Sequence, residues 1–360
     1  MLGTSSIIEF VKRNKISPEH YAEDNSLIST FQISIAEFIS GGYFNGFDEE
    51  STTGGLLGAF GATAPWCSAL YGINPKFGWI RYPKSGGSTI SESATGSDFA
   101  IILKANDTTA RLAVFQAKRV DESKNTFQIH QISPSGADEE SIPEPQFLRL
   151  RDYGREILQT LGRNEIALPK MDWIHYLAYR NNSINCVPIS DLSDIDLIYQ
   201  SRRVDAANAY RIAYAKAAKA AKAIRKNKGD PSKVLNSAFR TSLMRSQWAD
   251  HGIKGISRTE NTVHLATLMT IGASGKVSEP AGWLEISAAE EARTIVEAIR
   301  AQMDVYESIG VDGPTPTLED AFTNWSDARD SRRTSLKADV VSEVTSELAN
   351  SNNLSRRLRP

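Results

Sequence analysis

Residues 96–119 read GSDFAIILKANDTTARLAVFQAKR, and the fold prediction starts from this stretch. The apolar runs at 99–103 and 110–115 have the length and the apolar composition of buried strands. The polar run at 104–109 joins them and is rich in turn-forming residues. The stretch therefore predicts a β-hairpin of two buried antiparallel strands.

The predicted register brings three polar side chains together. If the hairpin turns near Asp107, Asp98 lies opposite Gln116, and directly opposed residues have Cβ atoms roughly 5 Å apart. Because side chains alternate between the two faces of a strand, Gln116 and Lys118 share one face and Ala117 points to the other. We therefore expect Asp98, Gln116 and Lys118 to lie around one point.

The chemistry of this group favours metal-assisted cleavage of a phosphodiester. A carboxylate, an amide oxygen and a backbone carbonyl are ligands suited to Mg²⁺ or Mn²⁺, and Asp98, Gln116 and Ala117 supply one each. Such an ion polarises a phosphate and lowers the pKa of a bound water. Lys118 is placed to orient that water and to stabilise the developing negative charge.

These residues resemble the signature of the PD-(D/E)XK nuclease superfamily, the fold of many restriction endonucleases. The signature has an Asp at the start of one strand and (Glu/Gln)-x-Lys on the next. The Gln-Ala-Lys form at 116–118 is similar to the Mrr-type branch, and the runs ESATGSDF at 92–99 and FQAKR at 115–119 are similar to restriction or phage-defence families. The resemblance covers roughly residues 90–185.

The resemblance implies an α/β fold with a restriction-endonuclease-like mixed sheet core flanked by helices. It also implies a Mg²⁺-dependent endonuclease in restriction or antiviral defence, with DNA favoured over RNA as the substrate. A homo-oligomer or an activating defence partner is a further expectation. The alternative is a non-catalytic nucleic-acid-binding or assembly protein that keeps the nuclease fold.

The superfamily usually adds an acidic residue from upstream, and two candidates stay open. Glu37 lies in a segment with helical apolar spacing, and the superfamily carries its extra Glu on the helix before the sheet. Glu92 precedes Asp98 by six residues and matches the defence-type pattern. The resemblance thus implies a catalytic set of Asp98, Gln116, Lys118 and Glu92, and a metal site in which Asp98 and Gln116 are joined by Glu37.

Other segments extend the prediction. A helix is predicted at 146–161 and a strand at 173–179, so the hairpin is followed by a helix and then a strand, the order expected of the nuclease core. Strands are also predicted at 262–271 and 282–286. The glycine-rich segment 41–64 is predicted to form turns or close-packing sites.

The charge distribution locates a candidate nucleic-acid interface. The formal net charge is −2, so any affinity for nucleic acid must come from a local patch. Between residues 202 and 245 there are twelve basic and two acidic residues. A predicted helix at 204–226 carries six of the basic side chains. Four of them are the expected nucleic-acid contacts, unless the helix is simply a solvated surface: Lys216, Lys219, Lys222 and Arg225.

Three regions are predicted. They are a nuclease core at 1–190, a basic helical region with strands at 191–310, and a polar tail or peripheral helix at 311–360.

Cys67 and Cys186 belong to no Cys-x-x-Cys motif and are expected to be reduced thiols of a cytoplasmic protein. No apolar run has the length of a membrane span, so no membrane partner is expected.

Overall fold

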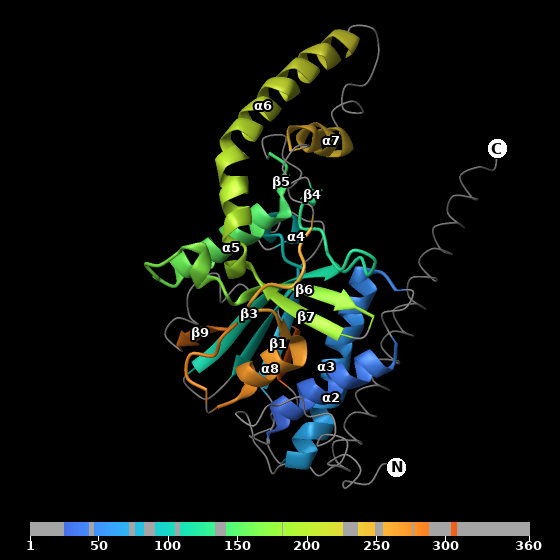
Figure 1. Cartoon of the computed structure of the whole chain (residues 1–360), viewed down its shortest axis with the longest axis vertical. Coiled ribbons are helices and arrows are strands. Elements are labelled where there is room, and N and C mark those ends of the chain that lie inside the picture. Colours follow the sequence, from blue (N-terminus) through green and yellow to red (C-terminus); the bar gives the residue numbers. More distant parts are fainter. Residues whose placement is uncertain are drawn as a thin grey trace, which may run out of the picture.

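The computed structural model of the chain has a mixed, open β-sheet flanked by helices (Figure 1). The structure describes residues 25–42, 47–71, 76–82, 91–104, 109–133, 142–181, 183–225, 237–248, 255–275, 277–287 and 304–307. The predicted tail at 311–360 and the hairpin turn near Asp107 lie outside these residues.

The main sheet has eight strands in the order β10-β1-β2-β3-β6-β7-β8, and β9 pairs with β3 beside that path. The strands are β1 (Lys76–Arg81), β2 (Phe99–Lys104), β3 (Thr109–Arg119), β6 (Ile174–Arg180), β7 (Ser183–Pro188), β8 (Val263–His264), β9 (Leu284–Ser287) and β10 (Asp304–Glu307). Every neighbouring pair is antiparallel except β3 and β6, which are parallel. A parallel pair needs a crossover, and α5 (Gln146–Thr160) lies in the connection between the two strands.

The predicted hairpin and its register are confirmed. Phe99 pairs with Phe115 and Ala100 with Val114, which continues to Asp98 opposite Gln116. The backbone N–H of Asp98 donates to the carbonyl of Phe115 over 2.9 Å, so the pairing extends past the formal start of β2.

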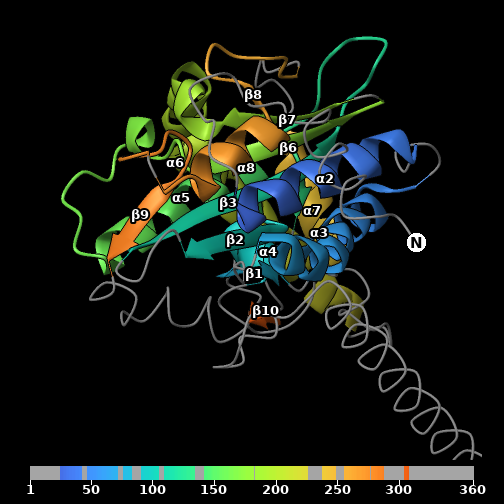
Figure 2. The ribbon, with the colours of Figure 1, turned by 90° about the horizontal axis from the view of Figure 1, so that it is seen from below.

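Two apolar layers cover the two faces of the sheet. One face, with Phe99 and Phe115, packs against α2 (Ser26–Ser40), α3 (Glu49–Tyr71) and α8 (Leu265–Ala273), which Figure 2 shows from below. The other face, with Val114 and Tyr176, packs against α5 and the first turns of α6 (Ser193–Arg225), with α7 (Ser237–Gln247) alongside. Because both faces are covered, β3 is buried along nearly its whole length.

Small elements complete the fold. They are α4 (Glu92–Thr95), the two-stranded sheet of β4 (Ile132–Ser133) and β5 (Glu144–Pro145), and the 3₁₀ turns η2 (Leu168–Lys170) and η3 (Ile189–Asp191). Cys67 and Cys186 are buried free thiols. Within the described residues no helix has both the length and the apolar character needed to cross a membrane.

The strand predicted at 262–271 is wrong. Only Val263–His264 is a strand, and Leu265–Ala273 is helix α8, whose side chains are nearly all buried. His264 caps this helix, because its Nδ1 accepts from the backbone N–H of Ala266 over 3.2 Å. A helix that is apolar on all sides shows no helical period in its sequence, which is why the run resembles a buried strand.

The glycine-rich segment 41–64 forms a helix instead of turns from Glu49 onward. Its glycines still serve close packing, because a Cβ on Gly55 would lie 3.1 Å from the ring of Phe38 on α2. Glycine therefore brings α2 and α3 together.

The sheet extends across the predicted boundary at residue 190. Strands β8, β9 and β10 all come from the region predicted as 191–310, and they join the sheet of the first region. In that region α6 projects away from the sheet, and α7 lies beside it (Figure 1).

Candidate active site

Asp98 and Gln116 meet where β2 begins. Oδ2 of Asp98 accepts from Nε2 of Gln116 over 2.6 Å and from the backbone N–H of Ala117 over 2.7 Å. The register that places residues 98 and 116 opposite each other is the cause of this contact. The predicted proximity of these two side chains is thus observed.

A tight approach of two helices fixes Asp98. Gly96 is the C-cap of helix α4, has a φ of +74° and donates its N–H to the carbonyl of Glu92. A Cβ on Gly96 would lie 2.7 Å from the carbonyl oxygen of Gln146, the first residue of α5. Both the positive φ and this contact require glycine, so Gly96 determines where the chain enters β2.

Lys118 lies on the same face of β3 as Gln116 and is 6% exposed. Its Nζ is 3.4 Å from Oε1 of Glu49 and 3.5 Å from Oε1 of Gln131. Oε2 of Glu49 accepts from the backbone N–H of Arg119 over 3.0 Å. Glu49 therefore connects the start of α3 to the end of β3, and it is a site residue that the sequence analysis missed.

A local signal for Glu49 is present in the sequence. Oδ1 of Asp48 accepts from the backbone N–H of Ser51 over 2.6 Å, which is the contact of an N-cap residue. Glu49 and Glu50 follow in the first helical turn, where negative charge is favourable. The run DEES at 48–51 is typical of a helix start, and only the glycines after it argue against a helix.

The electrostatics of Asp98 reflect its surroundings. Burial raises the pKa of Asp98 to about 7, the Lys118 ammonium opposes the rise, and the carboxylates of Glu92 and Glu49 add to it. Near neutral pH this carboxyl is therefore divided between its protonated and ionised forms.

The two open acidic candidates are placed differently. Glu92 lies in the first turn of α4, half-buried, and its charge acts on both Asp98 and Arg149. Glu37 lies on the exposed side of α2, and it is not among the carboxylates that act on Asp98. The structure thus gathers Glu92 and Glu49 around Asp98, and not Glu37.

The side-chain amides of Gln116 and Gln146 are hydrogen-bonded to each other next to Asp98. Oε1 of Gln116 accepts from Nε2 of Gln146 over 2.9 Å, and Nε2 of Gln116 is also 3.2 Å from the carbonyl oxygen of Ala117. The NH₂ group of Gln116 therefore lies between two oxygens, those of Asp98 and Ala117. Gln116 is fully buried.

The residue types around Asp98 are those that can hold a hard divalent cation of the Mg²⁺ type, but the Gln116 amide here presents its nitrogen and not its oxygen. Asp98, Gln116 and Ala117 offer a carboxylate, an amide and a carbonyl within one small volume, and Mg²⁺ takes few protein ligands and keeps waters or phosphates. Oε1 of Gln146 is buried and has no hydrogen-bond partner among the residues that the structure describes. No cluster of three or more His, Cys, Asp or Glu side chains suited to a metal is found in the described ranges, so amide and carbonyl oxygens would have to contribute.

A small pocket adjoins Glu49 at the ends of β3 and β6. Its lining includes Glu49, Thr52, Arg119 and Arg180. Arg119 and Arg180 thus place two cationic side chains in the lining of the pocket that also contains the carboxylate of Glu49.

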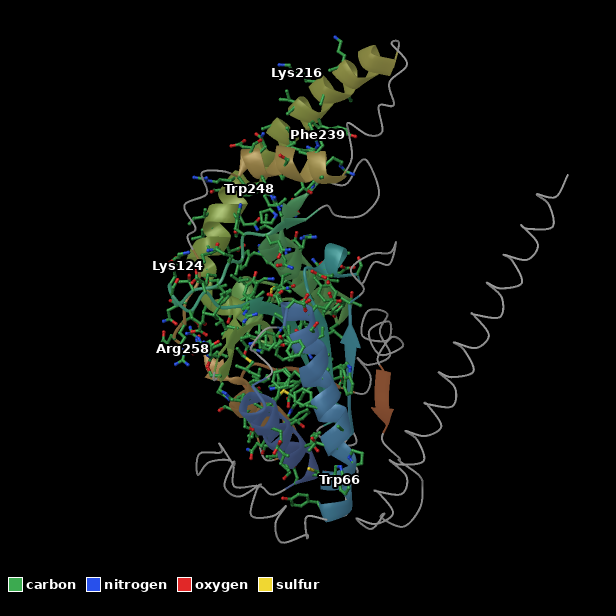
Figure 3. All side chains as sticks on the ribbon, turned by 90° about the vertical axis from the view of Figure 1, so that its right-hand side faces the viewer. Trp66, Lys124, Lys216, Phe239, Trp248 and Arg258 are labelled. Carbon is green, nitrogen blue, oxygen red and sulfur yellow. The ribbon has the colours of Figure 1, made fainter. Side chains whose placement is uncertain are left out.

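The basic helix lies apart from this site. Lys216 and Lys219 are exposed on α6, and Figure 3 shows Lys216 near the far end of the helix, well away from the sheet. Lys222 and Arg225 belong to the same helix, and their side chains lie outside the description. Arg203 anchors the other half of α6 through contacts of 2.7 Å with Glu144 and with Asp152.

Comparisons of the chain with models of protein families, with curated proteins and with solved structures each found no match. The assignment of function consequently depends on the site itself.

Proposed function

We propose that the protein is a metal-dependent nuclease that hydrolyses phosphodiester bonds, with DNA as the favoured substrate and restriction or antiviral defence as its setting. The observation that carries the proposal is that Asp98, just before β2, contacts Gln116 of β3, and that Lys118 lies on the same face of β3 with its charge acting on Asp98. Their residue types and spacing resemble the PD-(D/E)XK signature.

The order of elements supports this proposal. The meander β1–β2–β3 is followed by α5 and then by β6, which runs parallel to β3. This is the sequence of hairpin, helix and strand that the resemblance implies. Glu49 adds support, because it lies on the helix before the sheet, where the superfamily carries its extra Glu.

In this proposal Asp98, Gln116 and the carbonyl of Ala117 hold Mg²⁺ or Mn²⁺, and Glu49 or Glu92 completes the acidic set. When bound, the ion supplies a Lewis acid that polarises the scissile phosphate. Glu49 and Gln131 hold the ammonium of Lys118 beside this position. From there Lys118 can hydrogen-bond to the attacking water and stabilise negative charge on the phosphate.

One observation favours a second candidate, a nucleic-acid-binding or assembly protein without catalysis. Gln116 turns its NH₂ group, not its oxygen, toward Asp98, and an amide that donates at this position is not a metal ligand. In this second candidate function, the exposed lysines of α6 bind nucleic-acid phosphates and the sheet serves as a scaffold.

Labelled DNA and RNA duplexes, incubated with the protein in Mg²⁺ or in a chelator, separate the two candidates when binding and cleavage are measured on the same samples. The nuclease predicts cleavage of DNA in Mg²⁺ and none in the chelator. Salt-sensitive binding without cleavage in both conditions supports the second candidate. Absence of both binding and cleavage contradicts both.

A further inference from the structure

The hydrogen bond between Gln116 and Gln146 can run in either direction. Nε2 of Gln146 now donates to Oε1 of Gln116 over 2.9 Å, while Oε1 of Gln146 is buried and has no partner in the described part of the chain. An amide rotated by 180° exchanges its nitrogen and its oxygen with little change of shape. If both amides rotate, Gln116 donates to Gln146, and the pair keeps its hydrogen bond.

The same rotation changes what Gln116 offers to Asp98. In the present orientation its NH₂ group donates to Oδ2 of Asp98 and lies 3.2 Å from the carbonyl oxygen of Ala117. After rotation, the oxygen of Gln116 faces these two oxygens. Three oxygens around one point repel one another unless a cation lies among them, and with a divalent cation they form a ligand set.

Rotation of the Gln146 side-chain amide leaves the backbone contacts of this residue unchanged. The backbone N–H of Gln146 donates to the carbonyl of Gln131 over 2.8 Å, and its carbonyl oxygen packs against Gly96. Gln146 is 1% exposed, so bulk water does not compete for its amide. Its partner in either orientation is therefore Gln116.

We propose that Gln146 is a positioning residue that sets the orientation of the Gln116 amide, and that the two amides reverse together when a divalent cation enters. This inference rests on the metal site of the proposed function. Without the cation, the NH₂ group of Gln116 satisfies Asp98 and Ala117. With the cation, Gln116 turns its oxygen toward Asp98 and the carbonyl of Ala117, and its NH₂ group donates to Oε1 of Gln146.

Nuclear magnetic resonance of ¹⁵N-glutamine-labelled protein, with and without Mg²⁺, tests the reversal in the unmodified chain. The Gln116 side-chain signals are assigned by their loss in Gln116→Glu. In metal-free protein we expect a nuclear Overhauser effect between the Gln116 NH₂ protons and the backbone amide proton of Ala117, because both groups donate to the same oxygen. In saturating Mg²⁺ we expect this effect to disappear.

Calorimetric titration with Mg²⁺ tests the role of Gln146. Gln146→Glu leaves only acceptors at this position and favours the orientation of Gln116 with its oxygen inward. The matched control is Gln131→Glu, which adds the same charge beside Lys118 at a residue that contacts Lys118 and not Gln116. We expect Gln146→Glu to bind Mg²⁺ about fivefold more tightly than Gln131→Glu, the effect of about one hydrogen bond.

The outcomes separate this inference from the proposed function. Mg²⁺ binding with an unchanged Gln116 contact to Ala117, or equal affinities of the two Glu variants, overturns the inference alone. If the unmodified protein takes up no Mg²⁺, the metal site and the inference both fall. If Gln146→Glu does not fold, the NMR spectra of the unmodified chain with and without Mg²⁺ still show whether the Gln116 amide reverses.

Discussion

Nζ of Lys118 lies 3.4 Å from Oε1 of Glu49, a residue 69 positions earlier in the chain. This ion pair links the end of β3 to the first turn of α3, and it is mostly buried on the lysine side. It also places the carboxylate of Glu49, in addition to that of Glu92, where its charge acts on Asp98. The pair therefore joins the helix before the sheet to the hairpin that carries the signature residues.

Replacing Glu49 is expected to impair the site, whereas replacing Glu37 is not. Glu49→Gln removes the charge that holds Lys118, and we expect the rate of DNA cleavage to fall about 10- to 100-fold, as when a residue supporting a metal site is lost. Glu37→Gln, a change on the exposed side of α2, is the matched control and should leave the rate unchanged. Equal losses in the two variants would remove Glu49 from the site.

Binding of Mg²⁺ should strengthen as the pH rises through about 7. The pKa of Asp98 is raised to about 7, chiefly by burial, and only its ionised form is a ligand. Below this pH we expect the affinity to weaken by up to about tenfold per pH unit. Calorimetry from pH 5.5 to 8.5 measures this, and an affinity that does not vary with pH argues against Asp98 as a ligand.

The same raised pKa has the opposite effect on the stability of the metal-free protein. A folded-state pKa above the ordinary aspartate value of 3.8 means that the fold favours the protonated carboxyl, so this contribution is full below pH 3.8 and is lost as the pH rises through about 7. Asp98→Asn resembles the protonated form, and we expect it to stabilise the protein at pH 8 by roughly 1–3 kcal/mol. Urea unfolding in a chelator at pH 5 and pH 8 should show a larger gain at pH 8.

The hairpin was predictable from sequence because its information is local. Two apolar runs around a polar turn set the register, and the register alone places Asp98 opposite Gln116. Glu49 was not predicted, because its contact with Lys118 depends on how α3 packs against the sheet. The glycines that allow α3 to approach α2, such as Gly55, are the residues that made this helix resemble turns.

Helix α8 escaped prediction for a related reason. Its C-terminal end is bound by a distant residue, Arg111 of β3, whose Nη1 donates to the carbonyls of Gly272 and Ser274 over 2.7 Å each. These bonds satisfy carbonyl oxygens at the end of the helix. Nothing in the run 262–271 itself indicates them.

Arg111→Met is therefore expected to destabilise the protein by roughly 3–5 kcal/mol, because it leaves buried carbonyl oxygens and the carboxylate of Glu285 without their donor. The matched control, Arg163→Met, removes an exposed arginine that donates to the carbonyl of Glu285 and should change stability by less than about 0.5 kcal/mol. Urea unfolding measures both, and similar small losses would contradict the role assigned to Arg111.

The basic helix is expected to contribute to DNA binding and not to metal binding. Replacing Lys216 and Lys219 together with Gln should weaken DNA binding and lower the slope of log affinity against log salt by up to about 2, one unit per phosphate contact. Lys170→Gln, at an exposed lysine paired with Glu165, is the control. An unchanged slope would show that α6 is a solvated surface, and the Mg²⁺ affinity should not change in any of these variants.

Cleavage of supercoiled plasmid in Mg²⁺ by the unmodified protein and by Lys118→Met, at protein concentrations that bind equal amounts of DNA, tests the account most directly. We expect nicked or linear DNA from the unmodified protein and a rate lower by about 10²- to 10⁴-fold in Lys118→Met, because the variant loses the ammonium beside the phosphate. Equal cleavage by both proteins, or none by either, would contradict the assignment of Asp98, Gln116 and Lys118 as a nuclease site.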